Sequence, residues 1–221
     1  MASVCSQAEF NVLYSWRQMT KLRNVNARYL VIAFLIFAAA ERVYARRFSR
    51  QAARGQVKMT WTLAVLDVLH ATIYVGTAVE CLLARTATFG PLMALGLAVY
   101  AISLVLRHAA IRTLGRYWSL QLEIRDSHEL VRTGPYRYVR HPAYLAIILE
   151  VIAIPLVGRA YYTLLVSLGA YIPVLLLRWA GEEREMVKKL GEQYASYQRE
   201  VPAFFPRLWN VRRGSVSDRT A

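Results

Sequence analysis

The residues best suited to chemistry gather in segment 130–146, which reads LVRTGPYRYVRHPAYLA. Two dipeptides in it, Gly134-Pro135 and His141-Pro142, mark turns, because a residue before proline avoids the helical region. Aromatic and basic side chains lie between and just beyond these turns: Tyr136, Arg137, Tyr138, Arg140, His141 and Tyr144. Such groups, held by stiff turns, can line a pocket for a flat or charged ligand. Anchoring at a membrane interface is the alternative.

A second polar segment, 181–199, reads GEEREMVKKLGEQYASYQR and is predicted to form one helix that leaves a membrane. The acidic residues Glu182, Glu183 and Glu185 open it, where the helix dipole favours negative charge. Apolar side chains then recur at steps of three and four residues. This spacing predicts an amphipathic cytoplasmic helix that lies on the bilayer or closes over a site, with a solvated surface helix as the alternative.

Long apolar blocks must position these two segments. A helix needs about 20 apolar residues to cross a bilayer, and the blocks that approach this length are 29–44, 61–84, 91–107, 143–157 and 160–180. We therefore expect an all-α integral membrane protein with about five transmembrane helices. Only Gly158-Arg159 separates the last two blocks, which predicts a tight helical hairpin, and Pro173 is expected to kink its second arm.

Composition and charge agree with a membrane protein. The 221 residues are 56% hydrophobic, with 28 Lys+Arg against 14 Asp+Glu and a net charge of +14. This apolar content excludes intrinsic disorder. The basic residues sit mainly at the ends of apolar blocks, which favours a multi-pass membrane protein over a nucleic-acid-binding protein. The arginine-rich connection 107–140 and the chain beyond Arg178 are predicted to be cytoplasmic, whereas the orientation of the first block stays open.

Other potential sites are weakly indicated. Cys5 and Cys81 indicate neither a disulfide framework nor a metal site, and we expect no metal. Polar residues inside the apolar blocks, namely Asp67, His70, Glu80 and Glu150, are costly in hydrocarbon unless they face protein or water. Asp67 and His70 are three residues apart on one helical face. They either line a substrate tunnel or fix helix packing.

Two sequence blocks together carry a family resemblance. They are G-P-Y-R-Y-V-R-H-P-A-Y-L and, after the hairpin, E-E-R-E-M-x4-G-E-Q-Y-x2-Y-x3-V-P-x3-P. In order and spacing they resemble the isoprenylcysteine carboxyl methyltransferase family and the related membrane phospholipid methyltransferases, over about residues 114–206. The resemblance implies an S-adenosylmethionine-dependent methyltransferase without a Rossmann sheet, and no G-x-G-x-x-G follows a strand pattern here.

The resemblance also implies a domain division and a site. Residues 1–110 would be N-terminal membrane helices, 111–208 the catalytic region and 209–221 a flexible tail. The family's cofactor-binding positions fall on Tyr136, Arg140, His141, Pro142, Tyr144, Glu182 and Glu183. Among these, Glu183 or its neighbour would accept hydrogen bonds from ribose hydroxyls or the cofactor's ammonium, and Arg140 and His141 would hold its carboxylate.

The candidate catalytic residues are Arg140, Glu150 and Arg199. Glu150 or His141 would act as a base only for an amine or phenol, because a carboxylate or thiolate needs none. The family commonly has a basic residue directly before Val-Pro, whereas this chain has Glu200 there. Arg199, one place earlier, is the candidate to replace it.

The leading acceptor implied by the resemblance is an isoprenylcysteine-like carboxylate, methylated at the cytoplasmic face of the membrane. Phospholipid amines and small thiols are the alternative acceptors. Two other functions stay open: an NADPH-dependent enzyme like the sterol reductases, and a non-catalytic membrane binding protein. The expected partners are the membrane and a lipophilic, prenylated or lipid substrate, without nucleic acid. The sequence does not determine the oligomeric state.

Overall fold

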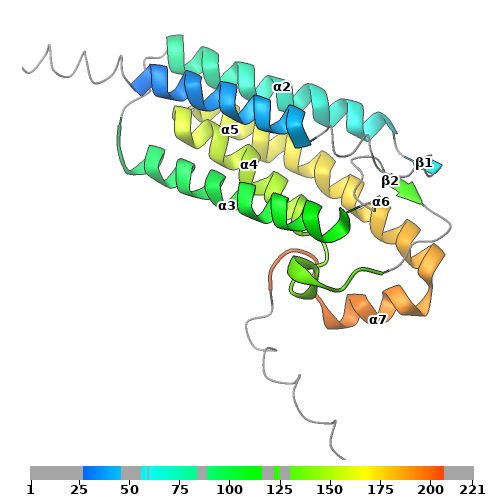
Figure 1. The fold of residues 1–221 in the computed structure, drawn as a ribbon. Coiled ribbons are helices and arrows are strands. Elements are labelled where there is room, and N and C mark those ends of the chain that lie inside the picture. The colour runs from blue at the N-terminus through cyan, green and yellow to red at the C-terminus, as the bar shows by residue number, and fades with distance from the viewer. Residues whose placement is uncertain are drawn as a thin grey trace, which may run out of the picture.

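The structure, a computed structural model, describes residues 27–45, 56–58, 60–83, 89–115, 122–124 and 130–206. Helices dominate it (Figure 1). The bundle consists of an N-terminal helix over residues 27–45, α2 (Thr60–Leu83), α3 (Pro91–Leu114), α4 (Pro142–Gly158), α5 (Tyr161–Val166) and α6 (Ile172–Leu190). In Figure 1, α6 extends beyond the other helices to α7 (Glu192–Glu200), which lies across that end. The predicted tail, 209–221, lies outside the described residues.

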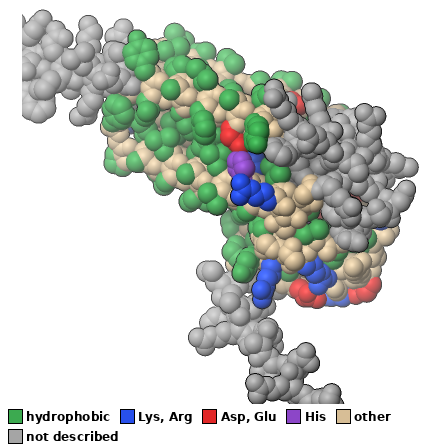
Figure 2. All heavy atoms as spheres, in the orientation of Figure 1, with side chains coloured by type: hydrophobic (Ala, Val, Ile, Leu, Met, Phe, Trp, Pro, Cys, Tyr) green, Lys and Arg blue, Asp and Glu red, His purple; other side chains and the backbone are tan. Residues whose placement is uncertain are grey.

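Within the described residues, three helical stretches are long and apolar enough to cross a membrane, namely Trp61–Leu83, Pro91–Leu114 and Tyr161–Leu190. Helix α4 is apolar but shorter. Apolar side chains cover the bundle, while charged side chains gather around α7 (Figure 2). The helical fold class and the membrane character are confirmed. The count of five spans remains a prediction, since neither α4 nor the helix over 27–45 is among the three.

The all-α expectation missed one small feature. Strands β1 (Gln56–Lys58) and β2 (Leu122–Ile124) pair antiparallel, with Val57 opposite Glu123. Strands of three residues are too short to produce a readable alternation of polar and apolar side chains. The ribbon joins the connection before α2 to the connection after α3.

The second arm of the hairpin changes its pitch rather than kinking sharply. Helices α5 and α6 are continuous through a π-helical turn, η3 (Ser167–Tyr171), which ends two residues before Pro173. Proline has no N–H for the helical ladder, and its ring clashes with the carbonyl four residues earlier. A widened turn relieves that clash. The predicted tight turn before α5 is present, with Arg159 in the left-handed region at φ 52°.

The single helix predicted over 181–199 is in fact two helices. Helix α6 ends at Leu190, and α7 starts at Glu192 after Gly191, whose φ is 53°. Glycine reaches this left-handed conformation without the steric penalty that a Cβ imposes, so the chain turns here. The helical periodicity on either side of Gly191 concealed the break. The turn directs α7 back toward segment 130–146.

Helices α3 and α4 pack closely and support the start of segment 130–146. A Cβ at Gly96 would lie 2.8 Å from the Val157 backbone nitrogen, so only glycine permits this approach. Next to α4, the 3-10 turn η2 (Gly134–Arg137) contacts α3. These contacts fix the turn at Arg140-His141-Pro142, called the R-H-P turn below, relative to the bundle.

Candidate functional site

The two polar segments identified in the sequence lie against each other. The backbone N–H of Arg140 donates to the Pro202 carbonyl at 2.9 Å, and that of His141 donates to Ala203 at 3.0 Å. From α7, the Tyr197 hydroxyl donates to the Tyr136 carbonyl at 2.6 Å. The R-H-P turn and the V-P-x3-P segment are therefore paired through their backbones, and α7 covers both.

Glu183 is the centre of this assembly. Its carboxylate accepts hydrogen bonds from Arg140 Nε at 3.2 Å and Nη2 at 3.1 Å, and from the Tyr194 hydroxyl at 2.9 Å. His141 Nε2 and Gln198 Nε2 also contact it. Arg140 Nη1 donates in turn to the carbonyls of Gln198 and Val201. One carboxylate thus ties α6 and α7 to the R-H-P turn.

Glu183 and Arg140, which are predicted to bind the cofactor, are already occupied by partners within the protein. Both Glu183 oxygens already accept several hydrogen bonds, and the Arg140 guanidinium is occupied by Glu183 and two backbone carbonyls. Glu182 can accept more further hydrogen bonds from a ligand than Glu183 can, and the Arg140 guanidinium is likewise largely occupied. The geometry of Glu183 and Arg140 suits a frame that positions the site.

Beside this frame lies a set of aromatic rings from three elements. The His141 ring is 5.5 Å from Tyr144 and 6.2 Å from both Trp179 and Phe204, measured between ring centroids. Trp179 and Phe204 are 5.1 Å apart. The hydroxyl of Tyr144 donates to Glu182 Oε2 at 2.6 Å. We call Tyr144, Trp179, Glu182 and Phe204 the aromatic recess.

The aromatic recess contains one buried polar atom that makes no hydrogen bond to the described residues. Trp179 Nε1 has no hydrogen-bond partner among the described residues. A buried donor left unpaired costs about 1–3 kcal/mol, so such a group is expected to meet a ligand or an ordered water. Together with the Glu182 carboxylate, the recess offers one donor, one anionic acceptor and several ring faces.

The tyrosines that hold the frame remain hydrogen-bond donors at neutral pH. Burial raises the pKa of Tyr197 to about 12, with the cations Arg140 and Arg132 opposing the rise. Burial also raises the pKa values of Tyr136 and Tyr194, and the acidic residues Glu182 and Glu183 add to this effect. The Tyr194 hydroxyl can therefore donate to Glu183 throughout the physiological range.

The remaining predicted site residues lie in three different places. Pro142 is buried at the first position of α4, where a proline fits the helix start. Glu150 is completely buried farther along α4, about 9 Å from Tyr144 along the helix axis. Arg199 lies on the exposed side of α7, paired with Glu192. The structure thus gathers the cofactor candidates and separates two of the three catalytic candidates from them.

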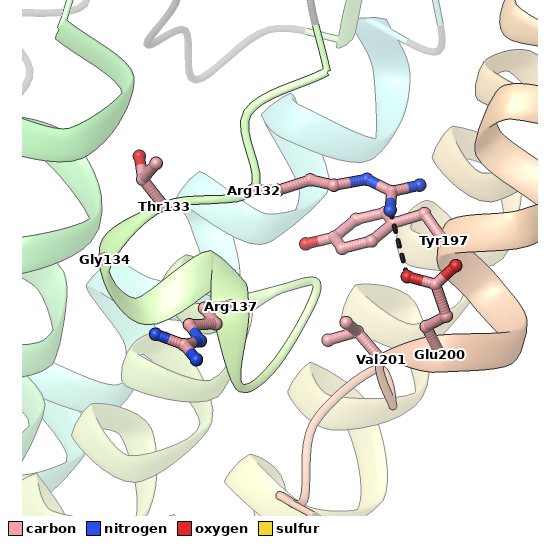
Figure 3. Close-up of a pocket in the computed structure, with 7 residues that line it drawn as sticks. All are labelled: Arg132, Thr133, Gly134, Arg137, Tyr197, Glu200 and Val201. Atoms are coloured by element: carbon pink, nitrogen blue, oxygen red, sulfur yellow. Dashed lines mark hydrogen bonds and ion pairs between the residues drawn. The ribbon is translucent and has the colours of Figure 1, made fainter. Parts of the chain in front are cut away.

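A cavity of about 540 Å³ lies between η2 and α7 (Figure 3). It is lined by Arg132, Thr133, Gly134, Arg137, Tyr197, Glu200 and Val201. Arg132 stacks over the Tyr197 ring at 5.0 Å and pairs with Glu200 at 3.0 Å. Glu200, the departure from the family pattern, thus holds a neighbouring arginine in an exposed ion pair.

Sequence reasoning missed Trp179, Phe204, Tyr194 and Gln198 as site residues. Trp179 was hidden in an apolar block, and Phe204 between two prolines. Tyr194 and Gln198 could have been grouped from the sequence, because they stand four residues apart and share a helix face. Their common partner, Glu183, lies on a different helix, so the spacing of the two residues does not reveal it.

Comparison with known proteins assigns residues 94–188 to the isoprenylcysteine carboxyl methyltransferase (ICMT) family. An uncharacterised protein of Haemophilus influenzae is 31% identical over 123 residues, covering 55% of this chain and 71% of that protein. Protein-S-isoprenylcysteine O-methyltransferase of Mus musculus is 30% identical over 135 residues, covering 55% and 44%. Methanethiol S-methyltransferase of Mycobacterium tuberculosis is 35% identical over 71 residues, covering 32% and 28%.

A solved structure shares the fold. It is that of the eukaryotic intramembrane Ras methyltransferase ICMT, with a TM-score of 0.53 and 23% sequence identity, covering 68% of this chain and 54% of that chain. The matched region is less than half the length of each of the two named methyltransferases above. Within this chain, the family match begins in α3 and ends near the end of α6.

Proposed function

The chain belongs to the isoprenylcysteine carboxyl methyltransferase family, and on that premise we propose that it is a membrane methyltransferase that uses S-adenosylmethionine. The observation that carries this proposal is the aromatic recess beside the Glu183 frame, which is Glu183 with its partners Arg140, His141, Tyr194 and Gln198. Its methyl acceptor would be a lipophilic or lipid-linked molecule, methylated at the cytoplasmic face of the membrane.

The residues present fit this cofactor. Trp179 Nε1 is a buried donor that no other described residue pairs with, which suits a carboxylate or a ring nitrogen. Glu182 accepts from Tyr144 through one oxygen, and its carboxylate can also accept from ribose hydroxyls or from an ammonium. The faces of Trp179, Phe204 and Tyr144 suit a flat base or a cationic sulfonium. We therefore assign cofactor binding to the aromatic recess, with Tyr136, Arg140, His141, Pro142 and Glu183 as the residues that support it.

The protein's contribution to the reaction would be orientation and exclusion of water. When bound, S-adenosylmethionine supplies a methyl group on a sulfonium, which carries its own leaving group. The Glu183 frame would hold α7 and the V-P-x3-P segment over the recess, and the covering would exclude water from the reacting atoms. A lipophilic acceptor would enter from the bilayer between apolar helices, since the recess lies where the helices leave the apolar surface.

Two acceptor classes are favoured by relatives. One is the isoprenylcysteine carboxylate implied by the family, and the other is a thiol, as in the methanethiol methyltransferase. Glu200 argues against the carboxylate class. The family commonly has a basic residue at this position, whereas this chain has an acid, which is paired with Arg132. Phospholipid amines are the third candidate. Methyl transfer itself is common to all three.

The proposed function is tested by assaying transfer of a labelled methyl group from S-adenosylmethionine in nanodiscs. The acceptor panel contains N-acetyl-S-farnesylcysteine, 1-octanethiol and phosphatidylethanolamine. Labelled product from at least one acceptor is expected. Absence of product with all three, together with oxidation of NADPH in the presence of a sterol, would favour the reductase alternative instead. Binding of S-adenosylhomocysteine without turnover of any acceptor would favour the non-catalytic alternative.

A further inference from the structure

The cavity of about 540 Å³ between η2 and α7 has no part in the proposed methyl transfer. None of its lining residues belongs to the aromatic recess or bonds to Glu183. Its volume falls within the range of about 300–1,000 Å³ that is typical of small-molecule pockets. The cavity also contains Glu200, the residue at which this chain departs from the family pattern. It is therefore a second potential binding site.

The cavity lies at the end of a candidate membrane span. Its lining residue Gly134 packs against α3, since a Cβ at this glycine would lie 2.5 Å from Thr113 Oγ1. Thr113 is one residue before the end of α3, whose 24 residues extend over about 36 Å. The hydrocarbon core of a bilayer is about 30 Å thick. We therefore expect the cavity to lie at the depth of the lipid headgroups, where an exposed aromatic such as Tyr138 is also typical.

The cavity carries a net positive charge. Its charged side chains are two arginines, Arg132 and Arg137, and one acid, Glu200. Figure 3 shows Arg137 on η2 at one side and the pair of Arg132 and Glu200 at the other. Arg132 Nη1 lies 3.0 Å from Glu200 Oε2, and the two side chains are 38% and 59% exposed. Exposed ion pairs contribute little to stability, so an incoming anion can compete with Glu200 for Arg132.

Arg137 is available to receive such an anion. Its guanidinium makes no hydrogen bond or ion pair with other residues in the described part of the chain. A guanidinium presents parallel N–H donors that match two oxygens of a phosphate. The exposed hydroxyl of Thr133 adds a donor in the same cavity. At headgroup depth the abundant anion is the phosphate of a phospholipid, and basic pockets at membrane surfaces bind such headgroups.

We propose that this cavity binds the phosphate of an anionic membrane phospholipid, mainly through Arg137. The acyl chains would lie against the apolar surface of the bundle, which adjoins the charged end around α7 (Figure 2). Glu200 would weaken the binding, because it repels the phosphate and holds Arg132. Since η2 and α7 form the two sides of the cavity, a bound headgroup would hold these elements together. The binding does not depend on methyl transfer.

The test is calorimetric titration of the detergent-purified full chain with dioleoyl phosphatidylglycerol, carried in micelles of an uncharged detergent. We expect saturable binding of one lipid per chain. Dioleoyl phosphatidylcholine, whose choline cation neutralises its phosphate, should bind about tenfold more weakly, since a hydrogen bond to a charged group contributes about 1.5–3 kcal/mol. Equal isotherms for the two lipids would overturn the proposal. Binding of several phosphatidylglycerol molecules without saturation would also overturn it, because general attraction to a negative surface would explain that result.

Three variants locate the binding. Arg137→Gln should weaken phosphatidylglycerol binding about tenfold, because charge-assisted hydrogen bonds are lost. Arg184→Gln removes the same charge from an exposed position of α6 outside the cavity and is the matched control. It should change the affinity little at physiological ionic strength, where the Debye length is about 8 Å. Glu200→Gln should strengthen binding about threefold, because it releases Arg132. Equal losses in the 137 and 184 variants, or no gain in the 200 variant, would overturn the assignment to this cavity.

A competition experiment separates lipid phosphate from soluble phosphate. Millimolar inorganic phosphate, compared with sodium chloride of equal ionic strength, is expected not to displace phosphatidylglycerol, because it lacks the apolar chains that add to the binding. Displacement, together with direct phosphate binding that Arg137→Gln abolishes, would mean that the cavity takes a soluble phosphate and that the lipid proposal is wrong. None of these results depends on S-adenosylhomocysteine binding, so a failure here leaves the proposed function intact.

Discussion

At the scale of single residues, the adjacent acids Glu182 and Glu183 make different contacts. Glu183 anchors the R-H-P turn through Arg140, His141 and Tyr194. Glu182 contacts Tyr144 and borders the aromatic recess. We therefore propose that one acid of this pair holds the R-H-P turn and that the other serves the ligand.

The first prediction separates these tasks by isosteric substitution. Glu183→Gln leaves the Arg140 guanidinium without its anion, so it should lower the unfolding midpoint and weaken cofactor binding together. Glu182→Gln should weaken S-adenosylhomocysteine binding about tenfold with little change in the midpoint, since a hydrogen bond to a charged group contributes about 1.5–3 kcal/mol. Calorimetric titration and thermal unfolding measure the two quantities. Glu192→Gln on the exposed side of α7 is the control. Equal behaviour of the 182 and 183 variants would contradict the division.

The second prediction concerns Trp179. Replacing it by phenylalanine keeps a ring near Phe204 but removes the Nε1–H, which has no partner in the described part of the chain. We expect weaker S-adenosylhomocysteine binding, by about threefold to tenfold, and an unfolding midpoint that is unchanged or higher, because a buried unsatisfied donor has been removed. Trp61→Phe, at the exposed start of the first candidate span, serves as control. A lower midpoint with unchanged affinity would assign Trp179 to packing alone.

At the scale of elements, the close approach of α3 and α4 fixes the R-H-P turn relative to the bundle. Gly96→Val would place atoms against the Val157 backbone, which cannot retreat without moving α4. The third prediction is a loss of about 1–3 kcal/mol of stability, visible as a lower unfolding midpoint in detergent. Gly169→Ala, where an added Cβ meets nothing within 4 Å, should be neutral or slightly stabilising. Similar midpoints for the two variants would show that this approach is not tight.

The elements also show what sequence can and cannot predict. Apolar length located most bundle helices to within a few residues. The exceptions are α3, which continues to Leu114 beyond the predicted end at Arg107, and α6, which continues to Leu190 beyond the predicted end at 180. Arginine at 107 ended the apolar run but not the helix, because its guanidinium finds Glu150 inside the bundle. The break at Gly191 lay within a continuous helical period. Motif spacing identified the two polar segments, whereas their pairing depends on backbone contacts between residues about 60 positions apart.

At the scale of the whole molecule, an apolar helical surface is joined to a charged end around α7 (Figure 2). Val105 lies just past the middle of α3, within a candidate span, and is 71% exposed. Outside a membrane this exposure would be unfavourable. The surface is explained if lipid covers it.

The fourth prediction tests that orientation toward lipid. Val105→Arg places a charge on the lipid-facing side of α3, at a cost of about 2.5–3.5 kcal/mol on insertion scales when the position is central. We expect less protein in the membrane fraction and more degradation. Val187→Arg, at an exposed position near the end of α6, should be tolerated. Normal membrane yield of the Val105 variant would mean that this face of α3 does not meet hydrocarbon.

The most direct test of the central claim is calorimetric titration of the detergent-purified chain with S-adenosylhomocysteine, with NADPH as comparator and Glu182→Gln as the variant. The account predicts saturable binding of S-adenosylhomocysteine that is weakened in the variant, and none of NADPH. Binding of NADPH in its place, or S-adenosylhomocysteine binding unaffected by the loss of the Glu182 charge, would contradict the assignment of the aromatic recess as a methyl-donor site.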